Sequence, residues 1–258
     1  MLKSRLCIAF FAFAVGCAPA QKPLTDYVNP MLGTATLWDS VDLGFKPTKR
    51  TWGAEVFPGS SLPNAMVQVS PVTKFHSGAG YQYEDSVIYG FTHTNKGHWN
   101  LCHIPLLPVT GTPTPGDYCS PFSHERESAA PGYYQVFLDR YGVDAQLSST
   151  LRCAFHKYTY PAGAAASLLA DLQRSNEHVR AWDIRKEGDN VFAGWQQTGE
   201  KMYFYAVANR PVTGIEPVVE GDREVRIVRF GEGDGALELR IGFSFVSEKN
   251  ARENLEAE

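Results

Sequence analysis

The sequence predicts an all-β protein: an antiparallel β-sandwich with long N-terminal loops and the start of a helix at its C-terminus. Two observations predict the sheets. Short runs of alternating polarity recur along the chain, and groups of Gly, Pro, Asn and Asp separate them. A third observation, an almost complete lack of helical pattern before residue 247, excludes mixed folds. With 43% hydrophobic residues among 258, the chain can form a sizeable core.

The alternation is clearest from residue 133 onward. The strand-like runs there are YYQVFL, VDAQLSST, CAFHKYTYP, VRAWDIR, NVFAGWQQ, KMYFYAVA, EVRIVRF and LELRIGFSFV. Turn-forming groups such as EGDN and GEGDG lie between them. Residues 29–80 are instead rich in Gly, Pro and Trp, which indicates long loops over a sheet. Ordered loops on a rigid scaffold are where function usually resides.

Residues 1–20 have the pattern of an export leader. MLKSR is basic, and LCIAFFAFAVGC is an apolar run shorter than the ~20 residues that a membrane-spanning helix needs. Two processing routes stay open. AVGC, ending at Cys17, resembles a lipobox, which predicts a lipid-anchored protein in a periplasm or at a cell surface. APA at 18–20 suits ordinary signal peptidase and predicts a secreted protein; we favour lipidation of Cys17.

Charge and cysteine content exclude other classes. The formal charge is −4, with 24 basic and 28 acidic residues, which argues against a nucleic-acid-binding protein because such proteins present a basic face. Beyond the leader only Cys102, Cys119 and Cys153 remain, so at least one thiol is unpaired. We expect three buried, inert thiols, since a core of this size does not need disulfides.

Residues 24–246 are expected to form the sandwich domain, and residues 247–258 a helix. Ser247 is a suitable N-cap, and Ala251 and Leu255 lie one helical turn apart. A helix of about a dozen residues with one large apolar side chain is marginal alone. We therefore expect it to pack on a partner or to lead into a further domain.

Five motifs, in order, resemble the N-terminal domain of glycoside hydrolase family 92. They are YVNPMLGT, VFPGSSLPNAMVQVSP, GYQYEDSVIYGFTHT, FSHERESAAPGYYQVFLDRYGVDAQLSSTLRCAFHKYTYP and GFSFVSEKNARENLEAE. The resemblance implies a calcium-dependent exo-α-mannosidase that acts by inversion on mannose-containing glycans. It also implies that the β-sandwich packs on an (α/α)6 barrel, with the active site between the two domains.

The same resemblance implies that this chain holds no catalytic residue and no metal ligand. The family's acid, base and most calcium ligands belong to the helical domain, so the chain alone is expected to be inactive. An inverting glycosidase needs two carboxyl groups roughly 6.5–9.5 Å apart. The acids near the loop motifs are expected to be solvated surface carboxylates: Glu55, Glu84, Asp85, Glu125 and Glu127.

Sugar recognition is expected from the segment FTHTNKGHWNLCH, residues 91–103. A strand ends near His93 and releases a loop in which Gly97 permits a turn. The flat face of Trp99 suits the CH groups of a pyranose, while His98 and Asn100 offer hydrogen-bonding groups. Two alternatives stay open: core packing for Trp99 and a structural hydrogen-bonding role for His93.

Zinc is not expected at the histidines of this segment. His93, His98 and His103 recur every five residues, which places them on one face of neither a helix nor a strand. His103 and His156 lie in strand-like runs and are interpreted as structural.

Gly33 and Thr34, in NPMLGT, form a second candidate sugar contact, because a glycine lets the backbone approach a ligand closely. This chain has Ala35 where the family has a further glycine, and Asn64 and Ala65 also depart from the family pattern. The alternative function is a stand-alone carbohydrate-binding or surface adhesion module that shares only the sandwich.

Overall fold

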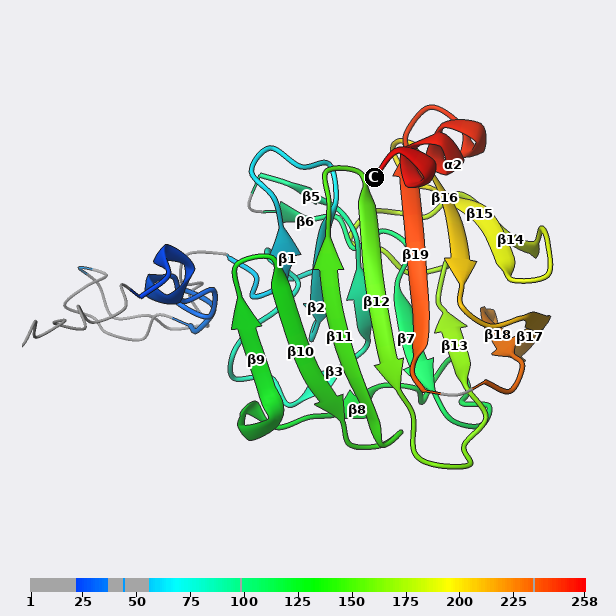
Figure 1. Ribbon diagram of the computed structural model, residues 1–258, viewed down its shortest axis with the longest axis horizontal. Helices are drawn as coiled ribbons and strands as arrows, with labels where there is room; N and C mark the ends of the chain where they lie inside the picture. Colours follow the sequence, from blue (N-terminus) through cyan, green and yellow to red (C-terminus); the bar gives the residue numbers. More distant parts are fainter. Residues whose placement is uncertain (1–21, 37–43, 45–55, 98, 234) are drawn as a thin grey trace, which may run out of the picture.

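The computed structural model describes residues 22–36, 44, 56–97, 99–233 and 235–258. Two large antiparallel sheets lie face to face, and one helix covers an end of the larger sheet (Figure 1). The predicted fold class, an antiparallel β-sandwich, is confirmed. The leader with Cys17 lies outside the described residues.

The larger sheet has eight strands and forms the layer nearer the viewer in Figure 1. In spatial order its strands are β14 (Ala181–Lys186), β15 (Val191–Gln197), β16 (Lys201–Ala208), β19 (Leu237–Ser244), β12 (Cys153–Thr159), β11 (Val143–Ser149), β10 (Tyr133–Leu138) and β9 (Glu127–Ala130). Buried and half-buried residues alternate without interruption along β10, β11 and β16. This period of two is the one that the sequence predicts for strands with one face against a core.

The second sheet has seven strands and joins segments that are far apart in the sequence. In spatial order these are β1 (Ser60–Ser61), β2 (Gln68–Val72), β4 (Gly90–Thr92), β7 (Leu106–Val109), β13 (Ser167–Ala170), β18 (Arg223–Phe230) and β17 (Val212–Glu220). β13 is buried at all four residues, because it lies between β7 and β18. The predicted N-terminal loop region therefore also supplies two strands.

Two short ribbons and two 3-10 turns complete the described elements. The ribbons pair β3 (Val87–Ile88) with β8 (Ser120–Pro121) and β5 (Asn95–Lys96) with β6 (Trp99–Asn100). The turns are η1 (Leu24–Tyr27) and η2 (His124–Arg126). The run SVIYGF, expected as one strand, is divided at Tyr89 into two strands. β3, before Tyr89, pairs with β8, and β4, after it, pairs with β2.

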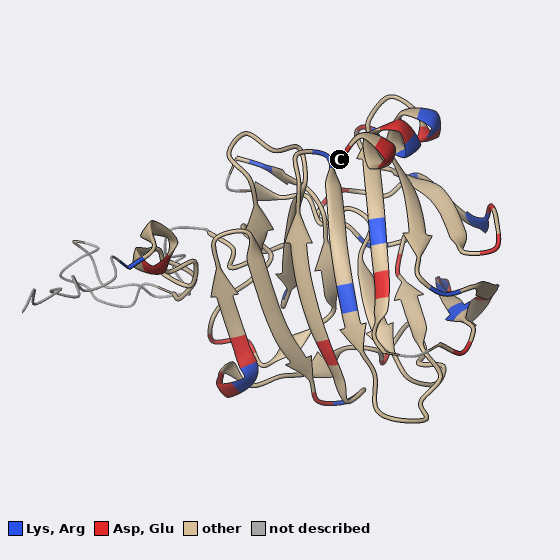
Figure 2. Cartoon of the chain, in the orientation of Figure 1, with Lys and Arg blue, Asp and Glu red and all other residues tan. Residues whose placement is uncertain are grey.

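The core lies between the inner faces of the two sheets. Its largest fully buried side chains include Phe91 from the smaller sheet and Tyr158, Phe204 and Phe243 from the larger one. Burial of each such side chain stabilises the fold by roughly 1.5–3 kcal/mol. Figure 2 shows charged residues mainly at strand ends, turns and the helix, which leaves the broad sheet face mostly uncharged.

Helix α2 (Glu248–Ala257) begins where the sequence predicts. The Ser247 hydroxyl accepts a hydrogen bond from the Asn250 N–H at 3.1 Å, which confirms the N-cap. Ala251 is buried against β19, where a Cβ at Gly242 would lie 2.1 Å from the Ala251 carbonyl oxygen. Gly242 therefore permits the close contact between helix and sheet. The Glu258 carboxylate accepts a hydrogen bond from Arg152 Nε at 2.6 Å.

The three cysteines of the described region are free. Cys102 and Cys153 are buried as expected, but Cys119 is only half-buried. Burial raises the pKa of the Cys153 thiol to about 11, so this thiol is protonated at neutral pH. No helix in the described part of the chain is long and apolar enough to cross a membrane.

Candidate functional site

The predicted sugar-binding loop is a β-hairpin. Asn95 pairs with Asn100 and Lys96 with Trp99, and the turn passes through Gly97, whose φ of 61° favours glycine. His98 lies outside the described residues. The hairpin follows β4 directly, so the transition predicted near His93 is present, with a ribbon in place of an irregular loop.

Asn100 is fully buried at the base of this hairpin. Its Nδ2 donates to the Ala79 carbonyl at 3.2 Å, and its Oδ1 accepts from the Cys102 N–H at 2.8 Å. A second Nδ2 bond, of 3.3 Å, reaches the Thr92 hydroxyl. The amide that we expected to contact a sugar therefore makes internal bonds that fix the hairpin. A direct substrate contact stays a prediction.

His93 is also fully buried and faces the larger sheet. Its Nε2 lies 3.1 Å from Nε2 of His156, whose Nδ1 lies 2.5 Å from the Tyr158 hydroxyl. Burial lowers the pKa of His93 to about 3 and also lowers the pKa of His156, so both rings are neutral at neutral pH. These bonds agree with the structural alternative for His93, whereas its contact with substrate stays a prediction.

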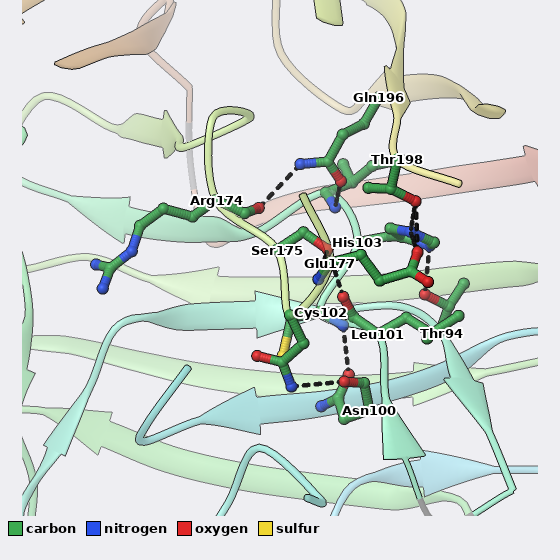
Figure 3. Close-up of polar contacts among 12 residues, drawn as sticks. Thr94, Asn100, Leu101, Cys102, His103, Arg174, Ser175, Glu177, Gln196 and Thr198 are labelled. Atoms are coloured by element: carbon green, nitrogen blue, oxygen red, sulfur yellow. Dashed lines mark hydrogen bonds and ion pairs between the residues drawn. The ribbon is translucent and has the colours of Figure 1, made fainter. Parts of the chain in front are cut away.

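His103 connects the hairpin segment to β15 and the chain after it. Its Nδ1 lies 2.9 Å from the Thr94 hydroxyl, and its Nε2 lies 3.0 Å from the Thr198 hydroxyl and 3.5 Å from a Glu177 oxygen (Figure 3). Burial lowers the pKa of His103, an effect that Glu177 opposes. The interpretation of His103 and His156 as structural residues is confirmed.

Trp99 has a different environment from its neighbours. It is half-buried on the hairpin and is absent from both clusters of buried apolar side chains that the described residues form. The ring therefore lies outside these clusters. The sugar contact of Trp99 stays a prediction.

Gly33 and Thr34 line a separate pocket of about 450 Å³. Gly33 has a φ of 89°, and the Thr34 hydroxyl donates to the Met31 carbonyl at 2.8 Å. The Tyr83 and His124 rings stack at the edge of this pocket with their centroids 3.9 Å apart. No described residue between 93 and 100 lines this pocket, so the structure does not bring the two predicted contact regions into one cavity.

Glu127 is not the solvated surface carboxylate that the sequence analysis expected. Its side chain is 1% exposed, and it accepts hydrogen bonds from the hydroxyls of Tyr81 at 2.9 Å and Tyr134 at 2.6 Å. His124 Nδ1 lies 2.5 Å from the same carboxylate. Burial and the Glu127 carboxylate raise the pKa of both phenols, which stay protonated as donors. Glu127 is thus a buried structural acid, not a solvated one.

The remaining acids near the loop motifs lie at or near the surface of the described chain. Glu84 accepts a hydrogen bond from the Thr36 N–H at 2.7 Å, Asp85 accepts one from the Thr73 hydroxyl at 2.7 Å, and Glu125 is exposed. Glu55 lies outside the described residues. The described residues contain no group of three or more His, Cys, Asp or Glu side chains that fits a metal ion, so they offer no calcium site by themselves.

A sizeable cavity in the described structure is one that the sequence analysis missed. It is a groove of about 810 Å³ formed by residues 173–182 together with His76 and Arg223. This segment, QRSNEHVRAW, connects β13 to β14 and combines three charged residues, two amides, a histidine and a tryptophan. The sequence signal that could have indicated this groove is the long polar connection between two strands.

Hydrogen bonds join the groove segment to the hairpin base (Figure 3). The Ser175 hydroxyl donates to the Leu101 carbonyl at 2.6 Å, and Asn176 Nδ2 donates to the Asn100 carbonyl at 2.6 Å. Behind them the buried Gln196 donates to the carbonyls of Leu172 and Arg174, both at 2.9 Å. The groove therefore has a preorganised backbone and adjoins the predicted sugar-binding hairpin.

Comparisons with known proteins agree with this architecture. The family 92 α-mannosidase BT3965 from Bacteroides thetaiotaomicron has 25% identity and a TM-score of 0.78, over 92% of this chain and 35% of that one. The family 92 glycosyl hydrolase ccman5 has 26% identity and a TM-score of 0.66, over 78% and 32%. The inverting mannosidase BT2199 from Bacteroides thetaiotaomicron VPI-5482 has the same fold at 23% identity and a TM-score of 0.74, over 93% and 34%.

This chain thus spans about a third of the length of these solved structures. A search of curated proteins gave no match. The family model described as the glycosyl hydrolase family 92 N-terminal domain matches residues 27–251. Because that match covers nearly the whole described sandwich, the chain belongs to the glycosyl hydrolase family 92 N-terminal domain family.

Proposed function

We propose that this chain is the sugar-recognising N-terminal domain of an α-mannosidase that hydrolyses terminal α-mannosides of glycans. Family membership supports the proposal, as do the relatives described as α-mannosidases, one of them in complex with mannoimidazole. The chain contributes contacts on the leaving-group side of a site that a further, helical domain completes. Residues 24–246 form the recognising domain, and the segment from Ser247 leads toward that further domain.

The environment of Trp99 carries the proposal. Its ring is half-buried on the hairpin, outside the core clusters, while Asn100 beside it is fixed by internal hydrogen bonds. An aromatic face on a rigid base suits stacking against the apolar face of a pyranose, because little conformational entropy is lost on binding. His98, Gly33 and Thr34 remain candidate contacts to the same glycan.

The decisive experiment is Trp99→Ala in the full-length enzyme. We expect kcat/KM on α-mannosides to fall about ten- to thirtyfold, which corresponds to roughly 1–2 kcal/mol of lost stacking. The melting temperature should change little. Trp195→Ala is the matched control, because Trp195 is also half-buried but lies on β15 under the Lys201 ammonium. A large fall in melting temperature with unchanged kcat/KM for Trp99→Ala would show that this ring is packing.

The reaction itself is assigned to residues outside this chain. We expect the purified chain to release no mannose with calcium supplied, since the described residues offer no metal site and the family's acid and base have no counterpart here. Measurable mannose release, free of contaminating hydrolase, would contradict this.

We further propose a periplasmic or cell-surface lipoprotein anchored through Cys17. The short apolar run that ends in AVGC supports it. Mass spectrometry of the mature N-terminus tests it: a diacylated Cys17 is expected, whereas an unmodified N-terminal Gln21 would indicate ordinary secretion.

A further inference from the structure

The groove of residues 173–182 has an excess of hydrogen-bond donors. Arg180 is exposed and makes no side-chain hydrogen bond or ion pair with any described residue. Arg174 uses one N–H, which donates to the Tyr118 hydroxyl at 3.2 Å, while its guanidinium lies 4.2 Å from the Phe75 ring centre. Its other N–H groups have no acceptor among the described side chains and carbonyls. Two arginines that line the groove therefore keep donors without a partner among the described residues.

Among the described residues, the side-chain acceptors of the groove are already in use except for the second oxygen of the Glu177 carboxylate. The Glu177 carboxylate accepts from the Thr198 hydroxyl at 2.5 Å and lies 3.5 Å from His103. The Ser175 hydroxyl and the Asn176 amide bond the hairpin segment and the backbone N–H of His76. A ligand with many donors, such as a second ammonium or guanidinium group, would find few partners here.

The groove also has an excess of positive formal charge. Arg223, the third arginine, is neutralised by Asp171 at 2.5 Å, and Glu177 offsets one further positive charge. By formal charge the groove therefore has one positive charge in excess, beside the imidazoles of His76 and His178, which have no hydrogen bond to a described residue. Trp182 adds an aromatic surface to the same wall. A volume of about 810 Å³ lies within the range of small-ligand sites and exceeds that of a simple anion.

We propose that this groove binds the acidic group of a glycan, a phosphate, sulfate or carboxylate carried by a sugar. The arginines supply charge-assisted hydrogen bonds to the acidic oxygens, and Trp182 contacts the sugar ring. The inference rests on the proposed function, which brings a glycan to the adjacent hairpin. It adds a second recognition site that distinguishes charged from neutral glycans.

The test is titration of the purified chain with mannose 6-phosphate, followed by calorimetry and tryptophan fluorescence. We expect binding at least tenfold tighter than that of mannose and weaker at high salt. Mannose 6-sulfate and glucuronic acid, titrated in parallel, identify which acidic group binds best. Inorganic phosphate should bind at least tenfold more weakly than mannose 6-phosphate. Equal affinity for mannose and all three acidic sugars would overturn the proposal, and inorganic phosphate binding as tightly as the sugar phosphate would overturn its glycan part.

Variants locate the site. Arg180→Ala should weaken mannose 6-phosphate binding about tenfold, and its exposed position avoids a folding defect. Arg240→Ala is the matched control, because it removes an exposed arginine of β19 that does not line the groove. Trp182→Phe should abolish the fluorescence change while calorimetry still detects binding. Equal effects of Arg180→Ala and Arg240→Ala would overturn the assignment.

The titration with acidic sugars and the Trp99→Ala experiment test the groove and the proposed function separately. Failure of acidic sugars to bind removes the groove assignment but leaves the effect of Trp99→Ala on neutral α-mannosides unchanged. An inactive full-length enzyme, in contrast, would remove the proposed function whatever the groove binds.

Discussion

The segment from His93 to His103 and the segment from Gln173 to Trp182 are both rich in polar side chains, but they differ in which of these side chains the fold uses. In the first, His93, Asn100 and His103 are buried and bonded to other parts of the protein. In the second, the exposed Arg180 guanidinium makes no hydrogen bond or ion pair with a described residue, at the edge of a groove.

The difference shows that a dense group of polar residues does not by itself mark a binding site. A buried polar group must be hydrogen-bonded, because leaving it unpaired costs about 1–3 kcal/mol, so many polar residues in a core segment satisfy one another. A polar side chain can bind a ligand only through donors and acceptors that are not already used in hydrogen bonds within the protein. The following predictions test whether the buried polar side chains of the first segment stabilise the fold and whether the Arg180 guanidinium of the second segment is free of internal bonds.

Acid should have the largest effect, through the buried histidine pair. The pKa of His93 is lowered to about 3 and that of His156 is also lowered, whereas both are about 6.5 in the unfolded chain. The unfolded state therefore binds more protons below pH 6.5, and stability is lost as pH falls from 6.5 toward 3. Between pH 7 and pH 5 the His93 ring should lower the free energy of unfolding by about 2 kcal/mol, and the His156 ring should add to this loss.

Urea unfolding at pH 7, 6 and 5 measures this loss. In His156→Phe the decrease between pH 7 and pH 5 should be smaller than in the wild type, whatever the stability of the variant at pH 7. A free energy of unfolding that does not change over this range would show that the pair is hydrated or protonated in the fold.

Asn100→Ala should have the next largest effect. It leaves the buried Cys102 N–H and Ala79 carbonyl without their partner, at a cost of about 2–4 kcal/mol in the free energy of unfolding. Asn95→Ala is the matched control, since Asn95 lies directly opposite in the hairpin and its amide has no hydrogen-bond partner in the described structure. Equal destabilisation of the two variants in urea would contradict the structural role of Asn100.

Ser175→Ala tests the connection between the two segments. Its hydroxyl donates to the Leu101 carbonyl at 2.6 Å and accepts from the Glu177 N–H at 3.1 Å. Its loss should reduce the free energy of unfolding by about 1–2 kcal/mol. Faster amide hydrogen exchange confined to residues around 101 and 177 would support a local link, whereas uniform changes over both sheets would not.

Arg180→Ala should have the smallest effect on stability. An exposed side chain without a protein partner contributes within about 0.5 kcal/mol, so urea unfolding should match the wild type. A larger loss would show that the guanidinium is engaged within the fold, and it would remove the contrast between the segments.

Much of the fold could be predicted because each strand carries its own signal. Alternation along VDAQLSST and KMYFYAVA gave β11 and β16, and Ser247 marked the first turn of α2. Pairing across the seven-stranded sheet could not be predicted, since β4, β7 and β13 are short and distant in the sequence. The division of SVIYGF at Tyr89 also depends on two different pairing partners.

The candidate site was predicted only in part. The strand end near His93 agrees with expectation, whereas the hairpin replaces the expected loop and the sugar contact of the half-buried Trp99 stays a prediction. The role of His93 was left open for a reason that the structure makes plain. Whether a histidine is buried depends on the opposite sheet, here on His156 and Phe243. Glu127 was misjudged on the same ground, because its donors Tyr81 and Tyr134 come from other elements.

The sequence by itself determined the period-two pattern, the helix start at Ser247, and the five motifs of the family, since these are properties of neighbouring residues. Tertiary structure alone decided which polar groups were used up and which remained free. Ser175 finds its acceptor 74 residues away, and Glu127 its donor Tyr81 46 residues away. Hydrogen-bond capacity is consumed by partners that only folding brings together, and so the groove at Arg174 and Arg180 became visible only in three dimensions.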